Sequence, residues 1–177
     1  VSMNVQGFGN KTKRAAIIKH LERFRPNIIC LSDTRLDQNS ENFVLNEFQY
    51  KGYFSSFSSN SRGVCILISK SFPISVENIK KDNSGNWIAL SLLFDTHRFN
   101  LINIYGPNED NPTFFENIFD THSRATSPET IICGDFNTTI NFDLDNANYV
   151  GIRNNRARTM LSQLMMDHAF LLQCSTK

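Results

Sequence analysis

One apolar run of the sequence ends in an aspartate and an asparagine, two residues apart, whose side chains are suited to phosphate chemistry. The run "IICGDFN" covers residues 131–137, and its apolar part ends at a glycine. Because strand side chains alternate between two faces, we expect Asp135 and Asn137 to point the same way and Phe136 to turn into the core. A neighbouring carboxylate and amide can hold a hard cation or a phosphate ester. An ordinary Asp/Asn turn would use the same residues, so the interpretation depends on the other strand ends.

Three further strand-like runs carry polar side chains at their ends. Asn4 lies in the run 1–5, and Asp33 follows the run 27–31. Tyr105 and Asn108 follow the run 101–104. Each of them alone also fits a turn former, a cap or an edge aromatic. Open sheets bind ligands beyond the carboxyl ends of their strands, so four such ends together predict one shared site.

The apolar pattern predicts alternating strands and helices. Strand patterns cover residues 1–5, 27–31, 53–57, 64–69, 74–80, 87–94, 98–104 and 130–133. Helical patterns cover residues 11–24, a segment starting at Pro112 behind an Asn111 cap, and residues 156–168. Residues 28–31 and 131–133 are continuously apolar, as in strands buried on both faces. We therefore predict an α/β (α+β) fold in which two sheets form a sandwich with helices outside.

Two side-chain expectations come from the helical patterns. In residues 11–24, Ile17, Leu21 and Phe24 should form the buried stripe. Basic side chains flank the first and third helices and could contact phosphates, although solvated helix ends would look the same. The basic residues are Lys11, Lys13 and Arg14 in one cluster and Arg153, Arg156 and Arg158 in the other.

The composition fits one globular domain and excludes several classes of protein. The chain has 177 residues, 40% hydrophobic and 20% charged, with a net charge of +1. Such a charge gives no broad electrostatic attraction to a polyanion, so local basic clusters or a metal ion would have to supply it. No stretch reaches the ~18 apolar residues of a membrane span, and no secretory signal opens the chain. Cys30, Cys65 and Cys133 lie in apolar runs, which predicts reduced, buried thiols in an intracellular protein.

Five blocks, in order, resemble one known superfamily. The blocks are "NVQG", "NIICLSDTRL", "RGVCILIS", "LINIYGPN" and "IICGDFN". They resemble the endonuclease/exonuclease/phosphatase superfamily, and most of all the apurinic-type endonuclease domain of non-LTR (LINE-type) retrotransposons. The resemblance implies a single four-layer domain over residues 1–177, and cleavage of phosphodiesters with a divalent metal ion.

The resemblance also implies a metal pocket lined by Asn4 and Asp33. Asp33 stands where the family usually has a glutamate, and its side chain is one methylene shorter. Oxygen ligands without a His/Cys cluster favour Mg²⁺, or Mn²⁺ in its place. The shorter carboxylate should weaken metal binding or hold the ion through water.

Further roles follow from the resemblance for the residues around the phosphate. Tyr105 would donate a hydrogen bond to the scissile phosphate, and Asn108 would support the Tyr105 loop. Asp135 would orient or deprotonate the attacking water, and Asn137 would help hold the phosphate. Arg153, Arg156 and Arg158 would bind flanking phosphates.

By the same resemblance, we expect the sequence to lack roughly the last third of the domain, including a closing Ser-Asp-His motif. The expected function is Mg²⁺-dependent nicking of DNA by a retrotransposon endonuclease in the nucleus, weak or absent in this fragment. The alternatives are a phosphomonoesterase or phospholipase of the same superfamily, and a degenerate remnant that only binds nucleic acid. The oligomeric state stays open.

Overall fold

The computed structural model describes residues 1–41, 48–122, 129–138 and 155–171. They divide into two compact units. The first unit comprises Val1–Tyr105 and Pro128–Asp135, and the second comprises Gly106–Ser127 and Phe136–Lys177.

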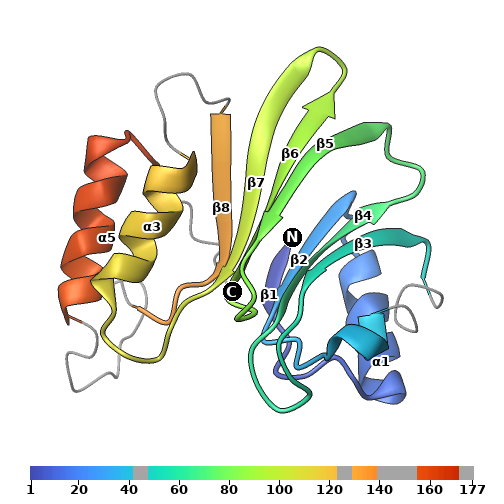
Figure 1. Ribbon diagram of the computed structural model, residues 1–177. Coiled ribbons are helices and arrows are strands. Elements are labelled where there is room, and N and C mark those ends of the chain that lie inside the picture. Colours follow the sequence, from blue (N-terminus) through green and yellow to red (C-terminus); the bar gives the residue numbers. More distant parts are fainter. Residues whose placement is uncertain (42–47, 123–128, 139–154, 172–177) are drawn as a thin grey trace. The chain divides into compact units, whose positions relative to one another are not determined.

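The first unit contains two mixed sheets of four strands each (Figure 1). One sheet has the order β1-β2-β4-β3, and its strands are β1 (Ser2–Asn4), β2 (Ile28–Ser32), β4 (Val64–Ser69) and β3 (Tyr50–Ser55). The other has the order β5-β6-β7-β8, with β5 (Ile74–Lys81), β6 (Trp87–Phe94), β7 (His97–Tyr105) and β8 (Glu129–Asp135). The pairs β1–β2 and β7–β8 are parallel, and the other pairs are antiparallel. The predicted α/β sandwich is confirmed.

Strand β4 shows why its sheet is buried on both faces. Val64, Ile66 and Ile68 belong to the apolar cluster shared with the second sheet. Cys65 and Leu67 belong to the cluster on the opposite face, which is covered by helix α1 (Lys11–Glu22). Because side chains alternate between the two faces, each apolar residue of β4 lies in one of the two cores.

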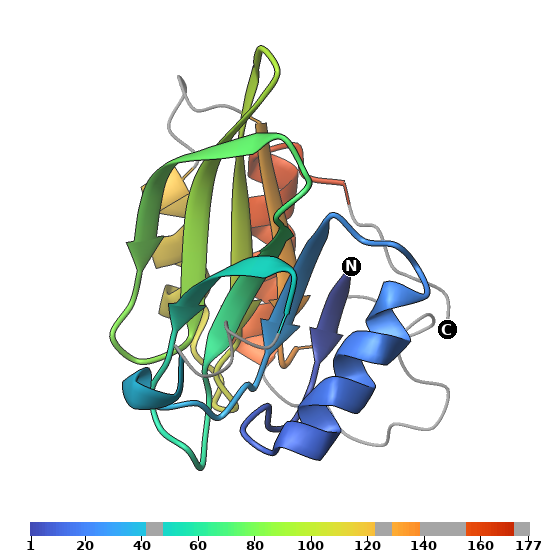
Figure 2. The ribbon, with the colours of Figure 1, turned by 90° about the vertical axis from the view of Figure 1, so that its right-hand side faces the viewer.

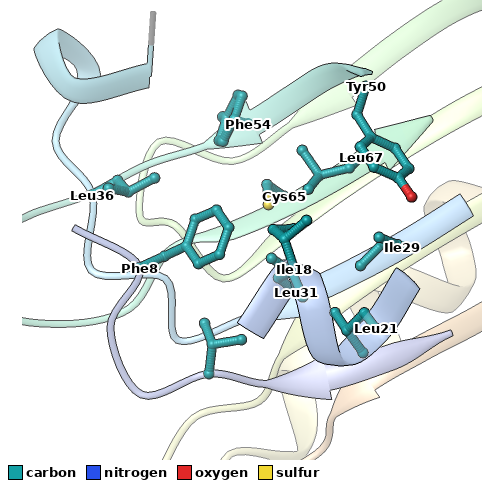
Figure 3. Packing of buried hydrophobic residues seen from close by; sticks show 11 residues of the cluster. Phe8, Ile18, Leu21, Ile29, Leu31, Leu36, Tyr50, Phe54, Cys65 and Leu67 are labelled. Atoms are coloured by element: carbon teal, nitrogen blue, oxygen red, sulfur yellow. The ribbon is translucent and has the colours of Figure 1, made fainter. Parts of the chain in front are cut away.

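Helix α1 packs along the outer face of the first sheet, as Figure 2 shows. Figure 3 shows Ile18 and Leu21 of this helix pointing towards the sheet, together with Phe8. Asn10 caps the helix because its side chain accepts a hydrogen bond from the Lys13 backbone N–H at 3.0 Å. The prediction that Phe24 is buried is wrong: the helix ends at Glu22, and Phe24 lies beyond it with 63% of its surface exposed.

Two strand predictions also need correction. Strand β3 ends at Ser55, so Phe57 lies in the following loop, exposed beneath the Arg62 guanidinium. Burial on both faces is wrong for β8, because Ile131 is 53% exposed. Ile131 is on the same face of β8 as Cys133, which packs against the second cluster, but β8 is an end strand of its sheet in the described part of the chain and the cluster does not reach Ile131.

The three cysteines of the described residues carry free thiols, as the sequence predicts. Cys30 and Cys65 are buried as predicted, whereas the predicted burial of Cys133 is wrong, because this residue of the end strand β8 is only partly buried. Burial raises the pKa of the Cys65 thiol well above its usual range. Cys65 is therefore a core residue rather than a nucleophile.

One buried amide joins the two sheets of the first unit. Asn103 on β7 is completely buried, and its Nδ2 donates to the carbonyl of Leu31 at 2.8 Å and to that of Cys65 at 2.9 Å. These carbonyls belong to β2 and β4, which pair in the opposite sheet. Asn103 therefore fixes the register of one sheet against the other at a point where apolar packing alone would allow sliding.

Asn103→Ala should lower the free energy of unfolding by about 3 kcal/mol, because it leaves two buried carbonyls without a donor and opens a small cavity. Urea denaturation followed by circular dichroism measures this change. Asn83→Ala, in an exposed turn, is the control and should change stability by less than about 0.5 kcal/mol. Equal stability of the two variants would show that the amide bridge contributes nothing.

The second unit contains helices α3 (Pro112–His122) and α5 (Asn155–Asp167), which pack against each other. Asn111 caps α3 as predicted, since its side chain accepts a hydrogen bond from the Phe114 N–H at 3.2 Å. Asp110 caps α5 from a distant part of the chain, accepting from the Ala157 N–H at 2.7 Å. This backbone hydrogen bond, with those from Arg156, holds the pKa of Asp110 below its usual value. None of the described helices is both long and apolar enough to cross a membrane.

Candidate active site

Two of the predicted strand ends meet directly. Asn4, the last residue of β1, donates from Nδ2 to Oδ2 of Asp135, the last residue of β8, at 2.6 Å across 131 positions of sequence. The Oδ1 of Asn4 accepts from the Gln6 backbone N–H at 3.0 Å. Because each end of the amide has its own partner, Asn4 is oriented and in turn holds the Asp135 carboxylate in place.

Tyr105 ends the strand beside Asp135. The two residues are direct partners in the parallel β7–β8 ladder. The backbone of Tyr105 is held by buried Asn86, whose carbonyl accepts from the Tyr105 N–H at 2.7 Å and whose Nδ2 donates to the Tyr105 carbonyl at 3.0 Å. Tyr105 and Asp135 thus leave the sheet at one edge, with the tyrosine backbone fixed.

The turn that carries Asn86 is shaped by Asp82. Its carboxylate accepts from the Asn86 N–H at 3.0 Å and from the Trp87 N–H at 3.2 Å, and also from the Ser55 hydroxyl. Sequence analysis missed both Asp82 and Asn86. The signal was present, since "DNSGN" is a typical turn sequence in which an aspartate caps the following backbone N–H groups.

Asp33, just beyond β2, lies at the same end of the first sheet as Asn4, because Asn4 and Ser32 are partners in the parallel β1–β2 ladder. Its backbone is in the left-handed region at φ +53°, which aspartate tolerates better than most residues. Its carbonyl accepts from the Gly7 N–H at 2.7 Å, in the loop that follows Asn4. The segment is thereby attached to the loop after β1.

Arg35 makes a two-pronged ion pair with Asp33. The guanidinium donates from Nε to Oδ1 at 3.1 Å and from Nη2 to Oδ2 at 2.8 Å. The Asp33 side chain is only 4% exposed, whereas that of Arg35 is 41% exposed. The hydrogen bonds and charge of Asp33 raise the pKa of Arg35. Asn4, Tyr105 and Asp135 therefore lie together at one end of the strands, and Asp33 follows the strand that pairs with that of Asn4. Their roles in a shared site stay a prediction.

The second unit contains the remaining predicted residues. Asn137 has φ +48° and donates from Nδ2 to the Gly106 carbonyl at 2.6 Å. Phe136 stacks on Phe115 of α3, with ring centroids 6.2 Å apart. Phe136 thus packs on a buried ring, in agreement with the predicted inward turn. Strand alternation does not extend to Asn137, because β8 ends at Asp135 and Asn137 is in the left-handed region. Asn108 is exposed in a bend.

Most of the predicted phosphate-binding arginines have protein partners. Arg156 forms an ion pair with Asp110 at 3.2 Å, and Arg158 donates to the Asn155 side chain at 2.9 Å. Arg153 lies outside the described residues.

In the other predicted basic cluster, Lys11, Lys13 and Arg14, the arginine is buried. Arg14 is 5% exposed, and its Nη1 donates to the carbonyls of Phe8 at 2.8 Å and Gly9 at 2.7 Å. The expectation that Arg14 contacts phosphates is therefore wrong, since its charge serves the loop that leads into α1. Lys13 is exposed and donates to the Gln6 carbonyl at 2.7 Å.

A family model for the endonuclease/exonuclease/phosphatase family matches residues 1–170. The chain belongs to this family, whose members are generally hydrolytic nucleases and phosphatases. The nucleases of this family generally use divalent metal ions.

Solved structures of nucleases share the fold. An AP endonuclease from Archaeoglobus fulgidus matches with a TM-score of 0.73 at 17% identity, over 93% of this chain and 68% of that one. The Xenopus laevis APE2 catalytic domain matches at 0.69 and 19% identity, over 92% and 66%. The endonuclease domain of TRAS1, a telomere-specific non-LTR retrotransposon, matches at 0.67 and 13% identity, over 92% and 70%. The chain thus spans about two thirds of each structure, and at these identities the likeness concerns the fold.

The side chains at this edge fit a hard divalent cation in their chemistry. Asn4, Asp33 and Asp135 offer amide and carboxylate oxygens, the ligands that Mg²⁺ and Mn²⁺ prefer. Among the described residues, however, no three His, Cys, Asp or Glu side chains lie close enough together to form a metal site. Asp33 also already carries an internal counter-ion in Arg35.

Proposed function

We propose that the protein hydrolyses phosphodiesters with the help of Mg²⁺, or Mn²⁺ in its place, and that it nicks DNA as the endonuclease of a non-LTR retrotransposon. The observation that carries the proposal is the 2.6 Å hydrogen bond between Asn4 and Asp135, with Tyr105 beside it in the sheet. A carboxylate held by an amide, with a tyrosine at the paired position of the neighbouring strand, is suited to act on water beside a phosphate. A retrotransposon endonuclease acts on chromosomal DNA, so the nucleus is its proposed compartment.

Each side chain has a role that follows from its chemistry. Asp135 accepts the proton of the attacking water, and the Asn4 amide holds the carboxylate in the orientation for this transfer. The Tyr105 hydroxyl donates to a non-bridging oxygen of the phosphate and stabilises charge there in the transition state. A bound divalent ion would supply further neutralisation of that charge, with Asn4 and Asp33 as its proposed ligands.

A direct test is nicking of supercoiled plasmid DNA by the purified chain. We expect conversion to the open circle with Mg²⁺ or Mn²⁺ and none with EDTA. Release of phosphate from a small phosphomonoester is measured in parallel. Release without nicking would instead identify a phosphomonoesterase, and DNA binding without either activity would identify a non-catalytic binding module.

A further inference from the structure

The pair of Arg35 and Asp33 has an unusual arrangement for a proposed metal ligand. Both carboxylate oxygens of Asp33 accept hydrogen bonds, at 3.1 and 2.8 Å, and both come from the same guanidinium. The carboxylate is almost buried, while 41% of the Arg35 side chain is exposed. The solvent-facing partner of the pair is therefore the cation, and an ion approaching from solution meets the guanidinium first.

Backbone hydrogen bonds hold the segment that carries Asp33 and Arg35 in place. The Arg35 N–H donates to the Arg62 carbonyl at 2.7 Å, and the Thr34 N–H donates to the Gly63 carbonyl at 2.9 Å. Arg35, like Asp33, has a positive φ, at +51°. Because these hydrogen bonds fix the backbone, the pair separates by side-chain rotation, and the half-exposed Arg35 side chain has more room to rotate than the buried Asp33 side chain.

A divalent ion and a guanidinium compete for one carboxylate. At about 4 Å, two positive charges repel strongly even at the effective dielectric of a protein surface. A metal ion bound at Asp33 would therefore have to displace Arg35 or bind against its charge.

From this geometry, and resting on the proposed function, we propose that Arg35 is an intramolecular competitor of the divalent metal for Asp33 and lowers the metal affinity of the site. Arg35 is a positioning residue in this sense: it acts through the carboxylate that it covers. Once displaced, its guanidinium is free to turn towards solvent and a substrate phosphate.

The proposal predicts that Arg35→Gln binds Mn²⁺ about tenfold more tightly than the wild-type chain, which is the factor expected from loss of one close, partly screened repulsion. Binding is measured by electron paramagnetic resonance of free Mn²⁺, without DNA and at fixed ionic strength. Arg35→Lys keeps the charge but loses the planar fork, so its Mn²⁺ affinity should lie between that of the wild type and that of Arg35→Gln. Adding Asp33→Asn to Arg35→Gln should abolish the gain.

Arg98→Gln is the matched control. Arg98 on β7 makes a similar two-pronged pair with Glu77 on β5, with Nε–Oε2 at 3.0 Å and Nη2–Oε1 at 3.1 Å. This variant removes the same charge away from the site and should bind Mn²⁺ as the wild type does. Thermal melting in EDTA checks that every variant is folded.

Three results would overturn the proposal. Equal affinities of Arg35→Gln and Arg98→Gln would mean that the metal does not use Asp33, and weaker binding by Arg35→Gln would mean that Arg35 orients the carboxylate for the metal. Absence of Mn²⁺ binding in every variant also contradicts it. Plasmid nicking separates these failures from failure of the proposed function, because metal-dependent nicking with unchanged Mn²⁺ affinity leaves the phosphodiesterase in place and removes only the role of Arg35.

Discussion

Asp135→Asn should lower the rate of plasmid nicking by about 10²–10⁴-fold, the usual contribution of a general base. The asparagine keeps the shape of the side chain, but its amide cannot accept the proton of the attacking water. Its Oδ1 can still accept the hydrogen bond from Asn4 that the carboxylate accepts at 2.6 Å. The fold should therefore remain while the chemistry is lost.

The rate is measured as open-circle formation at saturating Mg²⁺. The control is Asp95→Asn, which makes the same charge change in the turn between β6 and β7, at a positive φ that asparagine accepts readily. This control should nick like the wild type. If Asp135→Asn also retained the wild-type rate, Asp135 would not be the base and the proposed mechanism would fail.

Gly134→Ala should destabilise the protein by about 4 kcal/mol or more, one of the largest effects of any single substitution. Gly134 has φ +123°, a conformation that side chains rarely adopt. A methyl group there would collide with the backbone carbonyl of Ile104 in the neighbouring strand and approach the Asn103 side chain to 2.9 Å. The glycine is needed because β7 and β8 come together closely just before Asp135.

Urea denaturation measures this loss, and soluble expression at low temperature serves if the variant does not refold. The control is Gly9→Ala, where an added methyl group would meet no atom closer than 4.0 Å. Gly9→Ala should stay within about 1 kcal/mol of the wild type. A Gly134→Ala variant as stable as this control would show that the strand end adopts another conformation.

The sequence predicted most of the secondary structure because apolar periodicity was strong. The strands Val64–Ser69 and Trp87–Phe94 have their predicted bounds. Ile131 shows the limit of this approach. A run of apolar residues cannot say whether its strand lies inside a sheet or at its end, since that depends on strand order.

That Asn4, Tyr105 and Asp135 lie together, with Asp33 beyond the strand beside that of Asn4, was also predictable, because each of them ends or follows a strand and ligands bind beyond such ends. The partners of these residues were not. Arg35 reaches Asp33 through two departures into the left-handed region, at positions 33 and 35, which no periodic pattern encodes. The sequence pattern predicted Arg14 as a surface cation. Its side chain is buried, and its guanidinium donates to two carbonyl groups that only the folded loop brings together.

The central claim is that these strand ends form one metal-assisted phosphodiesterase site. The most direct measurement is an anomalous difference map from crystals of the protein grown with Mn²⁺. The account predicts a Mn²⁺ peak at this edge of the sheets, coordinated by side-chain oxygens of Asn4, Asp33 or Asp135, and a stronger peak in Arg35→Gln. Mn²⁺ bound only elsewhere, with Asp33 still held by Arg35 in both forms, would contradict it.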